Sequence, residues 1–263
     1  MRAILLFALA LLALAACGTG AANSPANKRP LAVAAAADLK FALDDVVARF
    51  EADHPDVDVR VTYGSSGTFH AQLTQKAPFD LYFSADIDYP QKLVEAGVAD
   101  KDTQFEYAVG RIVIWVPNKS PIDVGNLRHE ALLHPSVRKV AIANPVHAPY
   151  GRAAEAAMRD LGVYDRVKDR LVLGENIAQT AQFIDTGAAN IGIIALSLAI
   201  APQMKDKGKF WEIPLKHFPR MLQGGVTPKH ARNPADAKLL RDYVTSEAGR
   251  AILRQYGFYM PED

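Results

Sequence analysis

Residues 57–86 read VDVRVTYGSSGTFHAQLTQKAPFDLYFSAD, and they predict a strand, a helix and a second strand in that order. Residues 57–64 alternate apolar and polar side chains, which is the pattern of a half-buried strand. Residues 66–77 follow as a helix, and residues 79–86 form a second short apolar run. A strand, a helix and a strand in succession predict two parallel strands joined by a crossover helix.

Strands and helices alternate through the rest of the chain as well. Further strands are expected at 31–37, 105–118, 139–145, at the beginning of 190–200, at 211–215 and, with a turn, at 220–231. Further helices are expected at 38–55, 89–99, 178–189 and, as a pair, 233–258, and residues 150–172 are expected to be a helix and the segment that follows it. The chain has 263 residues, a length that suits one large domain or two of roughly 100–130 residues each. The pattern therefore predicts an α/β protein with two lobes.

The composition sets limits on what the protein binds. Hydrophobic residues make up 49% of the chain and charged residues 22%, as in a soluble globular protein. The formal net charge is only +1, so no overall field attracts nucleic acid or an anionic membrane surface. Any recognition of an anion must therefore be local.

The first 17 residues, MRAILLFALALLALAAC, predict a targeting segment. Arg2 is followed by an apolar stretch over 3–16, which is shorter than the roughly 20 residues that span a bilayer. The segment ends at Cys17, the only cysteine, which excludes an internal disulfide. LAAC resembles the lipobox of bacterial lipoproteins, which implies an acylated Cys17 and a lipid anchor; the alternative is an ordinary signal peptide that is removed with its cysteine. Residues 18–30 are predicted to be a tether.

Four strand-to-helix junctions have a composition suited to an anion, and they lie at 34–39, 63–68, 144–152 and 174–180. The start of a helix offers unpaired N–H groups and about half a positive charge. In α/β folds, ligands bind beyond the carboxyl ends of the strands, where these junctions fall. The junctions therefore predict a cleft for a small ligand, which an anion would suit.

Particular residues at these junctions are candidate donors. Ser65 and Ser66 carry hydroxyls, and Gly67 permits close approach of the backbone. Tyr150 carries a phenolic hydroxyl, and Ile177 offers its backbone N–H. The alternative for such a serine is an ordinary helix cap.

Several blocks resemble the periplasmic molybdate-binding proteins of ABC importers. AAAADLKFALDDVVARFEA, YGSSGTFHAQL and APFDLYFSAD are similar to the opening of that family. ANPVHAPYGRAAEAAMRDLG, GENIAQTAQFIDTGAANIGII and SEAGRAILRQYGF are similar to its later blocks. The order and spacing of the blocks hold over residues 31–258.

The resemblance implies a class II periplasmic-binding-protein fold, with a ligand cleft between two lobes that close by a hinge motion. One lobe is expected to comprise 31–108 and 224–263, and the other 109–223. The implied protein is a lipid-anchored monomer of the periplasm or cell envelope that captures molybdate or tungstate for an ABC permease. It has no catalytic role and no cofactor, and it binds the metal as an oxyanion, not as a cation.

The family's site residues fall on matching positions of this chain. The resemblance implies that Ser66 gives its hydroxyl and N–H, with Ser65 beside it, and that Tyr150 and Ile177 give backbone N–H groups. Two positions differ from the family. Asp38 stands where the family has a serine, and Ala195 stands where it has a tyrosine. The Tyr150 hydroxyl is expected to replace the one missing at Ala195.

A carboxylate at position 38 would repel a bound dianion by about 4 kcal/mol per charge at a distance of about 4 Å and an effective dielectric constant of about 20. Three arrangements avoid this: Asp38 caps its own helix, pairs with Arg152, or is protonated with a raised pKa. We expect capping, with Arg152 assisting. His147, in the loop before Tyr150, and Gly67 are expected to shape the cleft from behind the donors.

Other functions stay open at this stage. The cleft could take another oxyanion, such as sulfate, chromate or a phosphate ester. An enzyme could reuse the two-lobe cleft, although no motif gives Ser66 a histidine partner. A sensory or adhesive lipoprotein with a vestigial cleft is a third possibility. The seven histidines show no spacing typical of a metal site.

Overall fold

The computed structural model describes residues 28–263. The predicted signal segment with Cys17, and the predicted tether as far as residue 27, lie outside the described residues. The tether prediction is wrong for its last two residues. Strand β1 (Arg29–Ala36) begins at Arg29, because Arg29 and Pro30 pair with Val57 and Asp58 of the neighbouring strand.

The first lobe is built on a five-stranded mixed sheet in the order β2-β1-β3-β10-β4. The strands are β1, β2 (Val57–Gly64), β3 (Leu81–Ser84), β10 (Met221–Val226) and β4 (Phe105–Gly110). β1 is parallel to both β2 and β3, whereas β10 is antiparallel to β3 and β4. The sequence prediction of two parallel strands joined by a helix at 57–86 is borne out in topology, with β1 lying between them.

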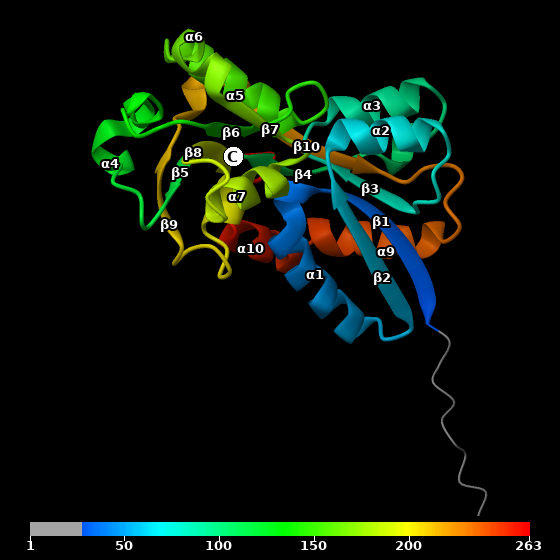
Figure 1. Ribbon diagram of the computed structural model, residues 1–263. Helices are drawn as coiled ribbons and strands as arrows, with labels where there is room; N and C mark the ends of the chain where they lie inside the picture. Colours follow the sequence, from blue (N-terminus) through cyan, green and yellow to red (C-terminus); the bar gives the residue numbers. More distant parts are fainter. Residues whose placement is uncertain (1–27) are drawn as a thin grey trace, which may run out of the picture.

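Helices cover both faces of this sheet (Figure 1). They are α1 (Lys40–Asp53), α2 (Ser66–Thr74), α3 (Asp88–Glu95), α9 (Pro234–Thr245) and α10 (Glu247–Gln255). Leu31, Val33 and Ala35 of β1 pack in one cluster with apolar side chains of α1, α9 and α10. Ala34 points to the opposite face, towards α2 and α3. Because both faces are buried, β1 is apolar throughout and does not alternate with polar residues.

The second lobe repeats the plan with a sheet in the order β7-β6-β8-β5-β9. Its strands are β5 (Ile112–Pro117), β6 (Val140–Ala143), β7 (Leu171–Gly174), β8 (Ile191–Ala195) and β9 (Gly208–Glu212). Its helices are α4 (Val124–Leu127), α5 (Pro149–Asp160), α6 (Tyr164–Val167), α7 (Ile177–Asp185) and α8 (Leu196–Ala199). Short 3₁₀ turns complete the chain: η1 (Ala37–Leu39), η2 (Lys101–Thr103), η3 (Arg128–Leu133), η4 (Lys168–Arg170) and η5 (Leu215–His217).

The chain crosses between the lobes twice, once at Arg111 and once over 213–220. The apolar run at 105–118 is therefore two strands in different sheets, not one. Arg111 separates them, because β4 pairs with β10 whereas β5 pairs with β8 and β9. The expected lobe boundaries at 108 and 224 fall inside β4 and β10. The first lobe's strands extend two residues further, to Gly110, and begin three residues earlier, at Met221.

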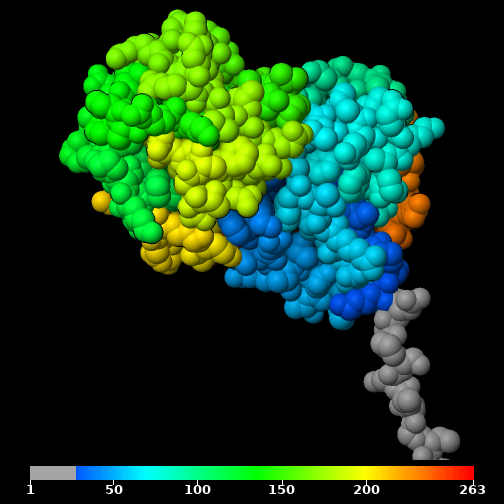
Figure 2. Space-filling model, in the orientation of Figure 1, coloured from blue at the N-terminus to red at the C-terminus, as the bar shows by residue number. Residues whose placement is uncertain are grey.

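The lobes are in contact in this structure. In Figure 2 the green and yellow atoms of the second lobe meet the blue and cyan atoms of the first along a continuous seam. The C-terminal residues lie near the crossing, where Tyr259 pairs with Val109 and its ring lies 4.2 Å from the Arg111 guanidinium. Among residues 28–263, no helix has both the length and the apolar character to cross a bilayer.

Candidate functional site

The four junctions singled out in the sequence meet at one small hollow between the lobes. Its lining residues are Ala36, Ala37, Asp38, Gly64, Ser65, Ser66, Ala85, Ala148, Pro149, Tyr150, Asn176 and Ile177. The structure therefore brings together all five residues predicted for the ligand site: Asp38, Ser65, Ser66, Tyr150 and Ile177. Among residues 28–263, no Lys, Arg or His lines this hollow.

The topology explains why these residues meet. β1 and β2 are parallel and end side by side, with Ala36 opposite Gly64. In the other lobe, β6 and β7 are parallel and end together, with Ala143 opposite Gly174. Each of these strands leads into a helical segment at its carboxyl end. Two pairs of such junctions, one pair per lobe, face each other across the hollow.

Helix starts supply backbone donors from both lobes. Asn176 caps α7 by accepting hydrogen bonds from the N–H groups of Ala178 and Gln179, each at 3.0 Å. Among residues 28–263, the N–H groups of Ser66, Tyr150 and Ile177 have no hydrogen-bond acceptor. They belong to the first turns of α2, α5 and α7, which lack intrahelical carbonyl partners. The positive ends of three helices therefore serve the hollow.

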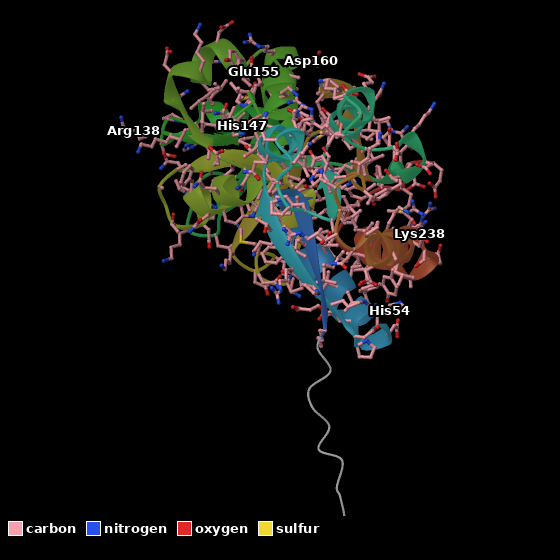
Figure 3. The ribbon with its side chains drawn as sticks, turned by 90° about the vertical axis from the view of Figure 1, so that its right-hand side faces the viewer. His54, Arg138, His147, Glu155, Asp160 and Lys238 are labelled. Atoms are coloured by element: carbon pink, nitrogen blue, oxygen red, sulfur yellow. The ribbon has the colours of Figure 1, made fainter. Side chains whose placement is uncertain are left out.

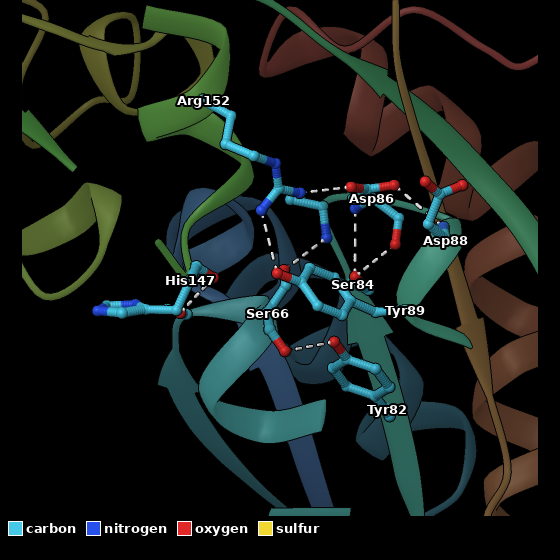
Figure 4. Close-up of polar contacts among 10 residues, drawn as sticks. Ser66, Tyr82, Ser84, Asp86, Asp88, Tyr89, His147 and Arg152 are labelled. Atoms are coloured by element: carbon cyan, nitrogen blue, oxygen red, sulfur yellow. Dashed lines mark hydrogen bonds and ion pairs between the residues drawn. The ribbon is translucent and has the colours of Figure 1, made fainter. Parts of the chain in front are cut away.

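Ser66 is the best-placed hydroxyl. Its side chain is buried, its Oγ accepts a hydrogen bond from the Ala85 N–H at 3.0 Å, and its carbonyl accepts one from the Tyr82 hydroxyl at 2.8 Å (Figure 4). Because Ala85 is the donor in the first of these bonds, the Ser66 hydroxyl proton remains available to a ligand. The network on both sides holds Ser66 in one position.

The hydroxyl of Ser65 is engaged elsewhere. It donates to the carbonyl of His147 at 2.8 Å and lies 2.9 Å from His147 Nδ1, which joins the two lobes (Figure 3 shows His147 beside α2). The Gly67 N–H donates to the same carbonyl at 2.9 Å. A side chain on Gly67 would lie 2.7 Å from that oxygen, so only glycine fits there. Ser65, Gly67 and His147 thus support the hollow from its rim.

Asp38 lies inside the site, with 1% of its surface exposed. Its Oδ2 accepts hydrogen bonds from the Tyr150 hydroxyl at 2.9 Å and from Gln223 Nε2 at 2.7 Å. Its Oδ1 has no partner among residues 28–263. Burial raises the pKa of Asp38 to about 6, and the hydrogen bonds from Gln223 and Tyr150 oppose part of that rise.

Two expectations about Asp38 are therefore wrong. It caps no helix: η1 begins at Ala37 with no side-chain cap, and α1 begins only at Lys40. It does not pair with Arg152, because that guanidinium bonds to Asp86 at the rim of the other lobe. The raised pKa of Asp38 is in the direction that the third arrangement, a protonated carboxyl group, requires.

The Tyr150 side chain is also committed. Its hydroxyl donates to Asp38 and receives a hydrogen bond from Gln223 Nε2 at 3.1 Å. Burial and the Asp38 charge hold the pKa of Tyr150 well above its usual range. The Tyr150 hydroxyl therefore does not simply replace the one missing at Ala195, which is buried at the end of β8 and does not line the hollow.

Sequence reasoning missed Gln223. It is fully buried on β10, and its amide completes a network with Asp38 and Tyr150. The hydroxyl of Tyr150 and the amide of Gln223 also lie 2.6 and 2.7 Å from where a Cβ of Gly110 would stand, so position 110 needs a glycine. One feature of the sequence could have indicated it: Gln223 is the only polar side chain in the strand MLQGGV, which otherwise consists of apolar residues and glycines.

A second contact joins the lobes at the rim, and we term it the interlobe latch: Arg152, Asp86 and Tyr89. Arg152 Nη2 lies 2.5 Å from Asp86 Oδ2, and Nη1 donates to the Tyr89 hydroxyl at 3.0 Å (Figure 4). The Asp86 side chain is 25% exposed and that of Arg152 41%. Within residues 28–263, no group of three or more His, Cys, Asp or Glu is placed to hold a metal ion.

Comparison with known proteins decides the family. The model of the bacterial extracellular solute-binding protein family matches residues 31–259. The chain belongs to this family. Membership makes it a solute-binding protein that acts outside the cytoplasm.

Individual relatives agree with this assignment. The solute-binding protein is 37% identical over 200 residues to the molybdate-binding protein ModA of Rhodobacter capsulatus, covering 76% of this chain and 77% of that one. It is 31% identical to ModA of Azotobacter vinelandii, over 92% of this chain and 95% of the relative.

The fold comparison is equally broad. The solved structure of the Azotobacter vinelandii periplasmic molybdate-binding protein matches with a TM-score of 0.81 and 29% identity, over 88% of this chain and 99% of that chain. The predicted two-lobe α/β binding-protein fold is thus confirmed, and so is the predicted family resemblance.

Proposed function

We propose that this solute-binding protein captures molybdate between its lobes and delivers it to the permease of an ABC importer. The observation that carries the proposal is a set of three N–H groups, on Ser66, Tyr150 and Ile177. All three residues line one hollow, from both lobes, and their N–H groups have no acceptor among residues 28–263. The molybdate-binding relatives name the oxyanion that such donors hold in similar chains.

The donors are neutral, and this suits an ion that must be released. A tetrahedral oxyanion presents four oxygens, each an acceptor. Ser66 gives it a hydroxyl and an N–H from the first lobe, and Tyr150 and Ile177 give N–H groups from the second. Each helix start adds roughly half a positive charge, which stabilises the anion without a full counter-ion. Tungstate has the same charge and tetrahedral shape, so the proposal includes it.

Capture requires the lobes to come together, because the donors belong to different lobes. In the closed arrangement the rim contacts of Ser65 with His147 and of Arg152 with Asp86 link the lobes. A ligand that contacts both lobes favours this arrangement over an open one. The two crossings at Arg111 and 213–220 are the segments about which the lobes would turn.

The remaining features belong to the same proposal. Cys17 would be acylated and hold the protein at the membrane in the periplasm or cell envelope, with 18–28 as the tether. The protein would act as a monomer and would not catalyse a reaction. Ser66 Oγ, the candidate nucleophile, accepts a hydrogen bond from the Ala85 N–H and contacts no general base among residues 28–263.

A second candidate is a protonated oxyanion, such as hydrogen phosphate or a phosphate ester. The unpartnered Asp38 Oδ1 favours it, because a protonated ligand needs an acceptor. Sulfate, which is fully deprotonated near neutral pH, would lack that contact.

A thermal-shift assay on residues 28–263 tests the proposal. A ligand that binds only the native state stabilises it by RT ln(1 + [L]/Kd), about 2.7 kcal/mol at a hundredfold excess over Kd. We expect the midpoint to rise with micromolar molybdate and tungstate, and less with sulfate, phosphate or chromate. Ser66→Ala should lose most of the shift, whereas Ser136→Ala, in an exposed turn outside the hollow, should keep it. Absence of a shift with every oxyanion would reject the proposal.

A further inference from the structure

A carboxyl group stands inside the site proposed for an anion. Asp38 lines the same hollow as Ser66 and Ile177, and it is buried. An ionised carboxylate there would face a ligand of like charge in a place with little water, where charges are poorly screened. The arrangement is consistent with tight binding of an anion only if this charge is neutralised.

Within the part of the chain that the structure describes, no cationic side chain neutralises it. Among residues 28–263, Asp38 forms no ion pair. Its side chain accepts hydrogen bonds from Gln223 and Tyr150, and the backbone N–H groups of Asp38 and Leu39 also lower its pKa, so every group that stabilises its charge is neutral. Arg152 lies on α5 two residues after Tyr150, but its guanidinium is bound to Asp86 and Tyr89. A proton is the remaining neutralising charge.

The groups packed around Asp38 are the following. α5 contributes Tyr150, β10 contributes Gln223, and β4 contributes Tyr107, whose hydroxyl donates to the Ser84 carbonyl. α8 contributes the Ser197 hydroxyl, which donates to the Asp38 backbone carbonyl at 2.8 Å. On α1, Lys40 lies over the Tyr63 ring at 5.1 Å and has no ion pair with Asp38. α7 contributes Ile177 and the uncharged Asn176 to the same hollow.

The hydrogen bonds show where a proton would sit. Asp38 Oδ2 already accepts two hydrogen bonds, from Tyr150 and Gln223, which fix the orientation of the carboxyl group. Oδ1 is buried and accepts none. A proton on Oδ1 would therefore keep both existing bonds and give the hollow one more donor.

We infer that the site takes up an oxyanion together with one proton, which is shared between Asp38 Oδ1 and a ligand oxygen. The inference rests on the proposed oxyanion function. The only bond that forms is an O–H bond: ionised Asp38 takes one proton from solvent, and the protonated carboxyl group and the oxyanion then form one complex. Asp38 thereby determines specificity, since an oxyanion that carries its own proton can supply it, and a fully deprotonated one must draw it from water.

Burial supports the step, since it raises the pKa of Asp38 to about 6 before any ligand arrives. The proton is thus already bound in part of the molecules just below neutral pH. Above that range each pH unit lowers the protonated fraction by about tenfold, and the affinity should fall in proportion.

Calorimetric titration of residues 28–263 with molybdate tests the inference. Titration at about pH 8 in buffers of different ionisation enthalpy gives the number of protons bound, which should be close to one. Between about pH 6.5 and about pH 8.5, Kd should rise on the order of 100-fold. Asp38→Asn keeps an acceptor for Tyr150 and Gln223 and places a permanent donor at the position of Oδ1. It should bind at about pH 8 at least tenfold more tightly than the unmodified protein, with no proton uptake.

Asp44→Asn is the matched control. Asp44 is exposed and also accepts a tyrosine hydroxyl, that of Tyr63 at 2.6 Å, but it is outside the hollow. This variant should keep the proton uptake and the pH dependence. Molybdate binding by the unmodified protein without proton uptake at about pH 8 would overturn the inference, even if Asp38→Asn did not fold. No oxyanion binding at any pH would instead reject the proposed function.

Discussion

Two contacts join the lobes through α5, and they deal with charge in opposite ways. At the rim, the latch pairs the Arg152 guanidinium with the Asp86 carboxylate. At the centre, Asp38 is buried between Tyr150 and Gln223 with no cation. At the solvent-exposed rim, the Asp86 carboxylate is balanced by a guanidinium. At the buried centre, the Asp38 carboxyl group is stabilised by hydrogen bonds and, in our proposal, by a proton. The centre remains free of fixed positive charge, so an anion is held there by neutral donors.

The helix geometry makes this division possible. Tyr150 and Arg152 are two residues apart on α5, and a helix turns by about 100° per residue, so their side chains diverge by about 200°. One reaches the buried network and the other reaches the rim. Four substitutions test how much each kind of contact contributes.

Asp38→Asn should give the largest change in stability. The folded-state pKa of about 6 lies above the reference value of 3.8, so the folded protein gains stability as the pH falls from above 6 towards 4. Above that window the ionised carboxylate costs at most about 3 kcal/mol, at 1.36 kcal/mol per pKa unit. The neutral amide of the variant removes this cost. Denaturant titration of ligand-free protein should show stabilisation by up to about 3 kcal/mol at about pH 8 and none at about pH 4. Equal effects at both pH values would contradict a buried charge.

Gln223→Met should have the next largest effect. It deletes the amide that donates to Asp38 Oδ2 at 2.7 Å and replaces it with a side chain of similar length. A hydrogen bond to a charged group contributes about 1.5–3 kcal/mol, so denaturant titration at about pH 8 should show destabilisation by about 2 kcal/mol. The loss should shrink once Asp38 is protonated. Gln72→Met, on the exposed face of α2, is the control, and an equal loss in both variants would speak against the network.

Ser65→Ala should cost about 1 kcal/mol in stability, the usual value for a lost N-cap. It removes the acceptor of the Thr68 N–H at 3.4 Å and the hydroxyl donor to the His147 carbonyl. Ser246→Ala removes a comparable cap of α10, from Gly249, within one lobe. Both should lower the thermal midpoint, but only Ser65→Ala should also weaken molybdate binding, because only Ser65 joins the lobes. Equal affinities in the two variants would show that the rim contact does not favour closure.

Arg152→Met should have the smallest effect. A half-exposed ion pair contributes at most about 1 kcal/mol, so molybdate affinity should fall by no more than about fivefold. The loss should shrink at high salt, because salt screens such pairs. Arg159→Met breaks the exposed pair with Glu155 within α5 and should leave calorimetric affinity unchanged. A loss of several kcal/mol at Arg152 would mean that the rim, not the centre, dominates closure.

The sequence was sufficient for the features that depend on local pattern. Strand and helix periodicity predicted both lobes, and the helix starts at Ser66 and Ile177 were placed correctly to within a residue. Because each of these helix starts follows a parallel strand, the sequence also predicted that they meet at one ligand site. Those features follow from neighbours in the chain.

Features that depend on distant partners were missed. Asp38 looked like a helix cap, but its partners Tyr150 and Gln223 lie 112 and 185 residues away. The break at Arg111 could not be predicted because the residues on both sides of it, 107–110 and 112–116, form buried strand segments, and only their pairing in different sheets separates them. Arg152 was assigned to Asp38, yet Asp86 on the opposite lobe is its partner.

Anomalous X-ray scattering at the molybdenum edge, from crystals of residues 28–263 grown with molybdate, tests the central claim most directly. We expect one strong peak in the hollow, with ligand oxygens at about 2.7–3.2 Å from the backbone nitrogens of Ser66 and Ile177. A peak elsewhere on the protein, or a hollow occupied only by water in crystals with excess molybdate, would contradict it.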